Sequence, residues 1–310
     1  MTLIHIVCSA KNAERYLGAF VDGLVAQTHR EWALWVRDDG SSDGTWALLQ
    51  TLCAREPRIV FVVRGSGSWG SVRGFGDVLG RLPVDAQVVA CGDADDVWMP
   101  QRLERTLAAL QEAERERAGP ILIHSDLVVV DEQLQVIAPS FWRSERVDPD
   151  FPSLRSLAIQ NVAVGPTLLF NGALLAELRT VPTTAIHQDW LIALVAAVTG
   201  RVVAVREPTV LYRQHGANTA GARLSSTWAR LGAAWSVRAR VARDLDHTAR
   251  QAAAVVERFG DRLSPVDLRA LQGLASIAEL RGWRRCVAIV RWRWLRAHGV
   301  PRNVGVVLRG

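Results

Sequence analysis

The amino-acid sequence predicts an α/β protein with a mixed, mainly parallel sheet, and two observations carry that prediction. Strand and helix patterns alternate through the first hundred residues, which is typical of a mainly parallel sheet wrapped by helices. Polar clusters follow three of the predicted strands, at 9–12, 38–44 and 93–96. Because ligands of such sheets bind beyond the carboxyl ends of the strands, we expect the three clusters to form one site at one edge.

The first half of the chain predicts four strands, at 3–8, 32–36, 59–63 and 87–90. Apolar residues at helical spacing predict helices over 14–26 and through Trp46, Leu49 and Leu52. Either Ser42 or Asp43 can cap the second of these helices. The glycine-rich stretch 65–76 matches no phosphate-binding spacing and is expected to be a loop. A helix over 101–117 is rich in paired charges, so we expect it on the surface.

The second half predicts short strands at 121–123, 127–130, 136–137, 167–170, 202–205 and 209–212. Asp189 opens a helix over 190–199, which Gly200 closes. The stretch 216–221 is rich in glycine and small residues and is expected to be a flexible boundary. Beyond it the chain reads as helices. The predicted organisation is therefore a ligand-binding domain over 1–221 and a helical extension over 222–310.

Composition is that of an ordinary globular protein of 310 residues, with 49% hydrophobic and 22% charged residues and a net charge of +6. Residues 281–310 carry eight arginines and no acid, which accounts for the excess of positive charge. The four cysteines are scattered, so we expect a reducing compartment and no disulfide framework. No signal peptide is visible, and the uncharged stretch 156–176 contains polar residues and a proline that disfavour a membrane span. We expect a cytoplasmic protein.

The acidic string at 93–96 is the most informative stretch of the chain. Asp93, Asp95 and Asp96 directly follow the apolar run 88–90. Like charges crowded at a sheet edge destabilise the fold unless a cation lies between them, and a divalent metal that carries a phosphorylated ligand is the simplest candidate. The alternative is a surface turn in which Asp96 only caps the helix after Pro100.

The loop at 38–44 is a second acidic, glycine-rich cluster. Asp38 and Asp39 can accept hydrogen bonds from a ribose hydroxyl or a pyrimidine N–H, and the glycines allow close backbone approach. For Ser41, Ser42 and Asp43 a capped turn is a sufficient explanation. Neither a P-loop nor a G-x-G-x-x-G motif follows the first strand, which disfavours a P-loop NTPase and a Rossmann dehydrogenase.

These motifs together resemble the family 2 glycosyltransferases of the GT-A fold. The motifs are Ser9-Ala10-Lys11-Asn12 with Tyr16-Leu17, then DDGSSDGT, then DADDVWMPQRL. Four later segments resemble the rhamnosyltransferase-like branch, which builds bacterial surface polysaccharides: HSDLVVVDEQLQVI at 124–137, NVAVGPTLLFN at 161–171, HQDWLIALVAAVTGRV at 187–202 and YRQHGANTAG at 212–221. The resemblance covers residues 3–221.

The resemblance implies an inverting, metal-dependent transfer of a sugar, L-rhamnose from dTDP-rhamnose, to a glycan or polyprenyl-linked acceptor. It implies that Asp38 and Asp39 bind the nucleoside. It also implies that Asp93 and Asp95 form a DxD-type element for Mg²⁺ or Mn²⁺, with Asp95 as the direct ligand. His215 would complete the metal site from a loop that closes over the diphosphate.

The resemblance assigns Asp189 to the catalytic base, with one departure from the branch. The branch usually reads His-Asp-Trp-Trp, whereas here Gln188 separates His187 from Asp189. If Asp189 is displaced, His187 becomes a rival base, and a plain helix N-cap is the other alternative for Asp189. The remaining expected substrate contacts are Ser9, Asn12, Trp98, Trp190 and Arg213, with core packing as the alternative for the two tryptophans.

The arginine-rich C-terminal tail predicts a helix over 282–296 with tryptophans on one face. Such a helix suits either the headgroup layer of an anionic membrane, on the inner face of the cytoplasmic membrane, or packing against the catalytic domain. Nucleic-acid binding is disfavoured by the acidic cleft.

Three alternative functions stay open at this point. A UDP-hexose donor is the alternative within the same class. A metal-dependent nucleotidyltransferase would also use clustered acids, but it would be expected to carry a basic glycine-rich loop after the first strand. A non-catalytic nucleotide-sugar sensor would bind the donor without turnover.

Overall fold

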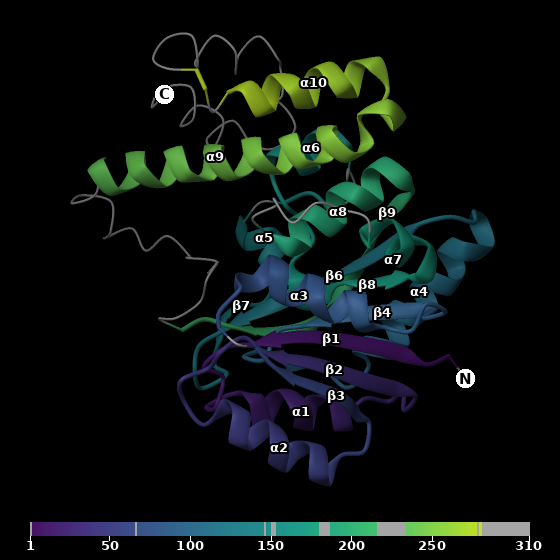
Figure 1. Cartoon of the computed structure of the whole chain (residues 1–310), viewed down its shortest axis with the longest axis vertical. Helices are drawn as coiled ribbons and strands as arrows, with labels where there is room; N and C mark the ends of the chain where they lie inside the picture. Colours follow the sequence, from purple (N-terminus) through teal and green to yellow (C-terminus); the bar gives the residue numbers. More distant parts are fainter. Residues whose placement is uncertain are drawn as a thin grey trace.

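A nine-stranded mixed sheet forms the centre of the molecule in the computed structural model (Figure 1). The structure describes residues 2–65, 67–145, 147–149, 153–179, 187–215, 234–277 and 279–280. The strands are β1 (Ile4–Ala10), β2 (Trp32–Asp38), β3 (Ile59–Arg64), β4 (Val88–Gly92), β5 (Val97–Trp98), β6 (Ile121–Val130), β7 (Val136–Ala138), β8 (Leu169–Asn171) and β9 (Arg201–Arg213). Their order across the sheet is β3-β2-β1-β4-β8-β6-β9-β5, and β7 pairs with β6.

The strand directions bring several carboxyl ends to one edge. β1 is parallel to β2 and to β4, and β2 is parallel to β3. β8 runs antiparallel to both β4 and β6, and β6 is parallel to β9. Because two reversals restore the direction, β9 ends at the same edge as β1 and β4. The segments that follow these three strands can therefore meet.

Helices cover both faces of the sheet (Figure 1). Their apolar side chains fill one buried cluster on the α1, α2 and α4 face and another on the α3, α7 and α8 face. The helices are α1 (Leu17–Val25), α2 (Thr45–Arg55), α3 (Gly70–Arg81), α4 (Arg102–Glu116), α5 (Phe141–Glu145), α6 (Leu154–Ile159), α7 (Gly172–Leu178), α8 (Gln188–Thr199), α9 (Ala234–Phe259) and α10 (Pro265–Ser276), with the 3-10 helices η1 (Gly165–Thr167) and η3 (Gly260–Arg262).

The helical extension is present as the hairpin of α9 and α10, which lies as an outer layer over α6 and α8 (Figure 1). Ala252, Val255 and Phe259 of α9 and Leu271 and Leu274 of α10 are buried in the same cluster as the apolar residues of α8. The predicted boundary at 216–221 and the predicted tail helix at 282–296 lie outside the described residues. Among the helices that are described, none is both long and apolar enough to cross a membrane.

The prediction of a loop over 65–76 is wrong from residue 70 onward, because residues 70–81 form α3. Its glycines disfavour a helix by their propensity. Phe75 and Val78 are nevertheless almost completely buried against the sheet, and burial of apolar side chains contributes more than the propensity costs.

Two pairs of predicted strands are each one continuous strand. The patterns at 121–123 and 127–130 belong to β6, and those at 202–205 and 209–212 belong to β9. Within the polar interruption of β6, Ser125 and Thr209 of β9 share a hydrogen bond of 2.6 Å between their hydroxyl oxygens. The pairing register shifts between Ser125 and Asp126, as expected for a β-bulge.

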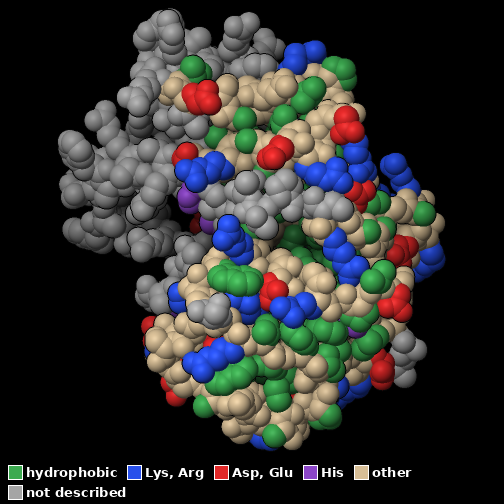
Figure 2. Space-filling view, in the orientation of Figure 1, with side chains coloured by type: hydrophobic (Ala, Val, Ile, Leu, Met, Phe, Trp, Pro, Cys, Tyr) green, Lys and Arg blue, Asp and Glu red, His purple; other side chains and the backbone are tan. Residues whose placement is uncertain are grey.

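The described part of the face in Figure 2 shows interspersed charges rather than a field of one sign. On the face of Figure 2, Lys and Arg side chains lie close to Asp and Glu side chains, with hydrophobic side chains between them. A nucleic-acid-binding face usually carries a basic stripe or patch. Within the described part of this face, no continuous basic stripe is seen.

Candidate active site

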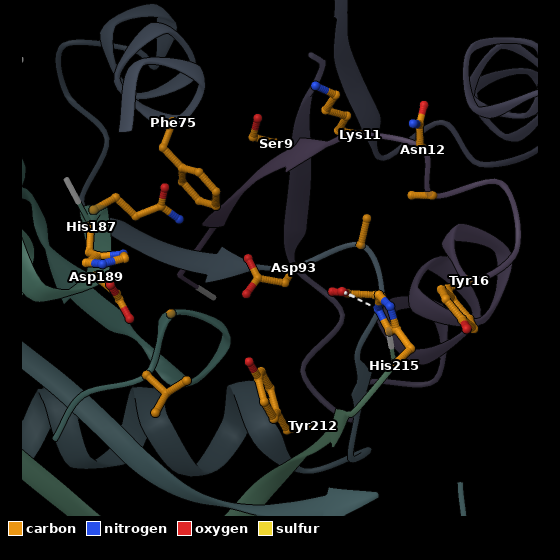
Figure 3. A pocket seen from close by; sticks show the side chains of 16 residues that line it. Ser9, Lys11, Asn12, Tyr16, Phe75, Asp93, His187, Asp189, Tyr212 and His215 are labelled. Carbon is orange, nitrogen blue, oxygen red and sulfur yellow. Dashed lines mark hydrogen bonds and ion pairs between the residues drawn. The ribbon is translucent and has the colours of Figure 1, made fainter. Parts of the chain in front are cut away.

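A cavity of about 440 Å³ lies at the sheet edge where β1, β4 and β9 end. It is lined from five places: the end of β1 with the segment after it, α3, the acidic string after β4, the loop of η1 with the start of α8, and the end of β9. Figure 3 shows Asp93 near its middle, His187 and Asp189 on one side, and Tyr16 and His215 on the other. The volume is in the range of sites that bind small molecules and cofactors.

Asp95 and His215 form a pair on one side of the cavity. His215 Nε2 lies 2.9 Å from Asp95 Oδ2, and the Asp95 side chain is 31% exposed (Figure 3). The Asp95 carboxylate is therefore available to a ligand. The string after β4 and the segment after β9, which are 120 residues apart in sequence, thus meet as predicted.

Asp93 lies between Asp95 and the far side of the cavity. Burial, and after it the charges of Asp95 and Asp189, raise the pKa of Asp93 to about 8. Three carboxylates around one cavity repel one another, which is the arrangement that a bound cation would relieve.

The donor set fits Mg²⁺ or Mn²⁺ only when the ligand supplies most of the coordination. In the described part of the chain, no group of three or more His, Cys, Asp and Glu side chains could hold a metal ion by itself. Asp95, with His215 and Asp93 near it, offers one to three ligands of suitable type. Phosphate oxygens and water would have to complete the shell, as is usual for Mg²⁺ bound with a phosphorylated substrate.

Arg213 holds the acidic string in place. Its Nε donates to the backbone oxygen of Asp95 at 2.8 Å, and its Nη1 donates to the backbone oxygen of Glu132 at 2.7 Å. Only 4% of the residue is exposed, and its guanidinium lies over the ring of Tyr16. The prediction that Arg213 contacts substrate is corrected: it positions the backbone of the metal-site candidate Asp95.

Asp96 does not cap the helix after Pro100. It is 1% exposed, and its Oδ1 accepts the backbone N–H of Arg213 at 2.9 Å. Helix α4 begins instead after Gln101, without a side-chain cap. Asp96 therefore joins the acidic string to β9.

Asp189 lies at the start of α8 on the opposite side of the cavity. Its Oδ2 accepts from Asn161 Nδ2 at 3.0 Å, and its Oδ1 accepts from the backbone N–H of Trp190 at 2.7 Å. Burial raises its pKa above the ordinary value. A carboxylate with a raised pKa that is held in a cavity is well suited to accept a proton.

His187, which was the rival base, also lines the cavity. Its ring packs against the indole of Trp190, with centroids 6.4 Å apart. Because Asp189 faces the cavity as well, the inserted Gln188 has not turned the carboxylate away from the site (Figure 3).

The segment after β1 contributes Ser9, Lys11 and Asn12 to the lining. Asn12 also supports the neighbouring loop, because its Oδ1 accepts the backbone N–H of Ser42 at 2.9 Å. Lys11, the only lysine of the chain, stands at the cavity opposite the acids (Figure 3). Ser9 and Asn12 were predicted at the site from the sequence, whereas Lys11 was not, although a single lysine in a chain rich in arginine is a signal that could have indicated it.

Asp38 and Asp39 lie beside the site without lining the cavity. Asp38 is fully buried, and its Oδ1 accepts the backbone N–H of Ser41. Asp39 is 3% exposed. Its carboxylate accepts hydrogen bonds of 2.9 to 3.0 Å from three donors: Ser68 Oγ and the backbone N–H groups of Trp69 and Gly70. A nucleoside could reach Asp39 only if residues 68–70 moved, so that role stays a prediction.

Trp98 and Trp190 are core residues, which corrects their predicted contact with substrate. Trp98 is 1% exposed, with its ring edge-on to Phe20 and beneath the guanidinium of Arg102. Trp190 is 8% exposed, and its indole N–H donates to the backbone oxygen of Leu157. Core packing, the alternative for both tryptophans, is what the structure shows.

Four further residues at the site were not singled out from the sequence. Asn161 holds the Asp189 carboxylate, and Phe75, Gly165 and Tyr212 line the cavity. Phe75 comes from α3, within the stretch 65–76 that the sequence predicts to be a loop. Asn161 and Gly165 lie within a stretch that carried the resemblance, but nothing local in the sequence indicates what their side chains and backbone contact.

Comparisons with known proteins relate the sequence and the fold of the chain to glycosyltransferases. The model of the family "Glycosyl transferase family 2" matches residues 5–151. An uncharacterized glycosyltransferase of Nostoc sp. is 26% identical over 231 residues, which is 72% of this chain and 68% of that protein.

Two solved structures have a similar fold at low sequence identity. Residues 1–349 of S. aureus TarS, in complex with UDP-GlcNAc, give a TM-score of 0.59 at 14% identity over 99% of this chain and 85% of that one. The chain spans only 51% of the longer TarS structure. The mannosyltransferase PcManGT from Pyrobaculum calidifontis, in complex with GDP-Man and Mn²⁺, gives 0.54 at 16% identity over 99% of this chain and 83% of that one. At such identities the likeness shows the fold.

Proposed function

We propose that this glycosyltransferase, whose residues 5–151 match the family 2 model and whose fold is of the GT-A type, is an inverting, metal-dependent enzyme that moves a sugar from a nucleoside diphosphate to a glycan or lipid-linked acceptor. One observation carries the proposal. Asp93, Asp95 and Asp189 line a single cavity, with a metal-site candidate on one side and a buried carboxylate on the other. Inverting transfer needs these two functions across a single sugar.

The donor's diphosphate belongs on the side of Asp95 and His215. A divalent cation held by Asp95, with His215 and Asp93 beside it, would neutralise the diphosphate as it leaves. Lys11, Ser9 and Asn12 line the same cavity from β1 and can donate hydrogen bonds to phosphate or sugar oxygens. PcManGT, which has a similar fold, is in complex with GDP-Man and Mn²⁺, and this supports trying that ion first.

Asp189 acts as the base on the acceptor side. The acceptor hydroxyl oxygen attacks the anomeric carbon, its proton passes to the Asp189 carboxylate, and the bond from that carbon to the diphosphate oxygen breaks. The nucleoside diphosphate leaves with the bonding electron pair, and the configuration at the anomeric carbon inverts. Asn161 keeps the Asp189 carboxylate directed at the cavity through its 3.0 Å hydrogen bond.

For the donor we propose dTDP-L-rhamnose, on the motifs over 124–221 that resemble the rhamnosyltransferase-like branch. A UDP-sugar is the second candidate, because the TarS structure with a similar fold is a complex with UDP-GlcNAc. The branch resemblance also supports an acceptor from bacterial surface-polysaccharide synthesis.

A thermal-shift panel tests the proposal. The protein is heated with dTDP-, UDP- and GDP-sugars, each with Mn²⁺, with Mg²⁺ and with EDTA. We expect one nucleotide class to raise the melting temperature in the presence of metal, and we expect Asp95→Ala to lose that effect. A panel without any shift would contradict a nucleotide-sugar function. A shift that Asp95→Ala retains would contradict only the metal assignment.

Asp189→Asn separates catalysis from binding. The substitution keeps the size of the side chain and removes its capacity to accept the proton. We expect an unchanged thermal shift with the donor and a loss of transfer of about 10²-fold or more. Asp22→Asn, at an exposed position of α1, is the matched control. Equal turnover in Asp189→Asn and in the wild type would exclude Asp189 as the base and return His187 to consideration.

A further inference from the structure

The N-terminus of α8, which carries Asp189, lacks a side-chain cap of its own. His187 is the N-cap residue, with an extended backbone, and its side chain accepts no hydrogen bond from the first turn. Its backbone oxygen accepts the N–H of Leu191 at 3.1 Å, as an N-cap carbonyl does. In the first turn the Asp189 carboxylate accepts the N–H of Trp190, and contacts from outside the helix add to what holds this helix end.

Helix α9 supplies two polar contacts to that same residue. Gln251 Nε2 donates to the backbone oxygen of His187 at 3.1 Å. Nδ1 of His247 lies 3.2 Å from Nε2 of His187, with ring centroids 5.1 Å apart. One of the two facing nitrogens must carry the hydrogen that joins them. Residues 60 and 64 positions later in the chain thus hold both the backbone and the side chain of His187.

These contacts are not needed to attach α9 to the molecule. Ala252, Val255 and Phe259 lie on the same helix, are 1% exposed or less, and belong to the large apolar cluster. Their burial accounts for the docking of the helix. Gln251, by contrast, is a fully buried amide, and a buried polar group stabilises a fold little but can fix one arrangement.

The polar contacts lie in the interior of α9, at the positions that face His187. His187 lines the cavity, and Asp189 follows two residues later in the first turn of α8. A shift of His187 would move that turn, and with it the carboxylate held by Asn161. A displacement of about 1 Å in a reacting group can cost roughly 10²-fold in rate.

We propose that His247 and Gln251 are positioning residues for the base: α9 clamps His187 and so holds Asp189 at the acceptor side of the cavity. The inference deepens the proposed function and rests on it. It assigns the helical extension a part in sugar transfer, because α9 holds the side of the cavity where the acceptor is proposed to bind.

Kinetics with three variants test the clamp. His247→Ala removes the imidazole contact, Gln251→Leu removes the amide contact, and His247→Gln keeps a side chain that can hydrogen bond. We expect kcat to fall 10- to 100-fold in the first two, with the donor KM within about twofold, because the metal side of the cavity is untouched. We expect His247→Gln to recover at least part of the lost kcat.

Two control variants on α9 separate positioning from stability. Val255→Ala removes buried apolar volume and should lower the melting temperature at least as much as His247→Ala, with kcat within about threefold of the wild type. Arg250→Ala is exposed and should change neither quantity. If Val255→Ala loses kcat in the same proportion as His247→Ala at the same loss of stability, the role of His247 is only structural and the proposal is overturned.

Hydrogen exchange supplies a readout that needs no turnover. We expect the amides of residues 188–192 to exchange faster in His247→Ala and Gln251→Leu than in Arg250→Ala. Unchanged exchange overturns the clamp, and faster exchange with unchanged kcat overturns its part in positioning Asp189. If the wild type binds no nucleotide sugar in the thermal-shift panel, the proposed function has failed. The exchange result then decides separately whether α9 holds α8.

Discussion

At the scale of single residues, the cavity contains carboxylates whose charged forms are destabilised by burial and by mutual repulsion. Asp93 shows this destabilisation most clearly, because burial first and then the charges of Asp95 and Asp189 raise its pKa to about 8. Buried like charges without a cation destabilise a fold, so such a group is retained where a ligand relieves the repulsion. The repulsion among these buried carboxylates is thus itself an indication that the site binds a ligand.

Gly165 separates the two carboxylates that belong to opposite sides of the proposed reaction. A Cβ atom at this position would lie 3.5 Å from Asp93 Oδ2 and 3.8 Å from Asp189 Cβ, which are ordinary contacts. We therefore expect Gly165→Ala to fold normally, with unfolding free energy within about 0.5 kcal/mol of the wild type. The methyl group would occupy the space between the carboxylates, so transfer should fall at least tenfold.

Gly76→Ala is the control for that prediction, because a Cβ there would meet nothing within 4 Å. It lies on an exposed helical position and should stabilise the protein by about 0.4–1 kcal/mol without loss of transfer. Unfolding in urea and transfer assays measure the two effects. Full transfer in Gly165→Ala would mean that the substrate does not pass between Asp93 and Asp189.

His124 makes the stability of the protein depend on pH. It is fully buried in β6, and burial lowers its pKa to about 4. The unfolded chain binds a proton near pH 6.5, whereas the folded protein does not, so stability should be constant above pH 6.5 and fall as the pH drops from 6.5 to 4. The loss due to this histidine should reach about 2 kcal/mol at pH 5.

His124→Leu should remove that part of the acid sensitivity. The measurement is the urea-unfolding free energy at pH 7.5 and at pH 5 for the variant and the wild type. The difference between the two pH values should shrink by about 2 kcal/mol in the variant. An unchanged difference would mean that His124 takes up a proton in the folded protein.

At the scale of elements, distant residues determine where helices start. Asp39 at the end of β2 accepts the first backbone N–H groups of the α3 region, although α3 begins thirty residues later. Burial alone would raise the pKa of Asp39. The hydrogen bonds from Trp69, Ser68, Gly70 and Arg37 together hold it below its ordinary value. A carboxylate that caps a helix N-terminus from another element stabilises both.

Asp39→Asn should loosen the start of α3. The amide offers one acceptor oxygen in place of two and no charge, so we expect a loss of about 1–2 kcal/mol in unfolding free energy. Hydrogen exchange should accelerate at residues 69–73 and remain slow in α2. In Asp43→Asn, which disturbs the contacts of Asp43 with Thr45 at the start of α2, the pattern should be reversed. Protection of α3 that survives in Asp39→Asn would show that α3 does not depend on this carboxylate.

At the scale of the whole molecule, one buried arginine ties the two halves of the site together. Arg102, at the start of α4, is completely buried, although the helix had been expected on the surface. Its guanidinium donates to the backbone oxygens of Pro166, Cys91 and Leu168. It therefore links the end of β4, which precedes Asp93, with the η1 loop.

Arg102→Met should destabilise the protein by about 3 kcal/mol or more, because it leaves several buried carbonyl oxygens without their donor. Burial lowers the pKa of Arg102 to about 9, so the wild-type contact persists at neutral pH. Arg105→Met, an exposed position on the same helix, is the control and should change stability by no more than about 0.5 kcal/mol. Equal urea midpoints for the two variants would contradict the linking role.

The sequence by itself determined the class of fold, the edge of the sheet that carries the site, and most of its acids. Strand and helix periodicity and clustered polar residues are local properties, and parallel strands bring their carboxyl ends together whatever their neighbours are. For this reason Asp93, Asp95, Asp189 and His215 could be expected at one cavity, which all four line, while their roles remain predictions. The domain boundary and the tail helix, which fall on residues outside the described part of the chain, remain predictions.

Only the tertiary structure decided which side chains face the cavity. Arg213, Trp98 and Trp190 are near the site in sequence but turn into the core or toward the backbone, because burial and hydrogen bonding there depend on residues more than twenty positions away. Helix α3 forms against its own propensity because the sheet buries one face of it. The contact of His247 with His187 joins α9 to the start of α8, which no local pattern in the sequence relates. The proposed part of the helical extension in the site could therefore not be predicted from the sequence.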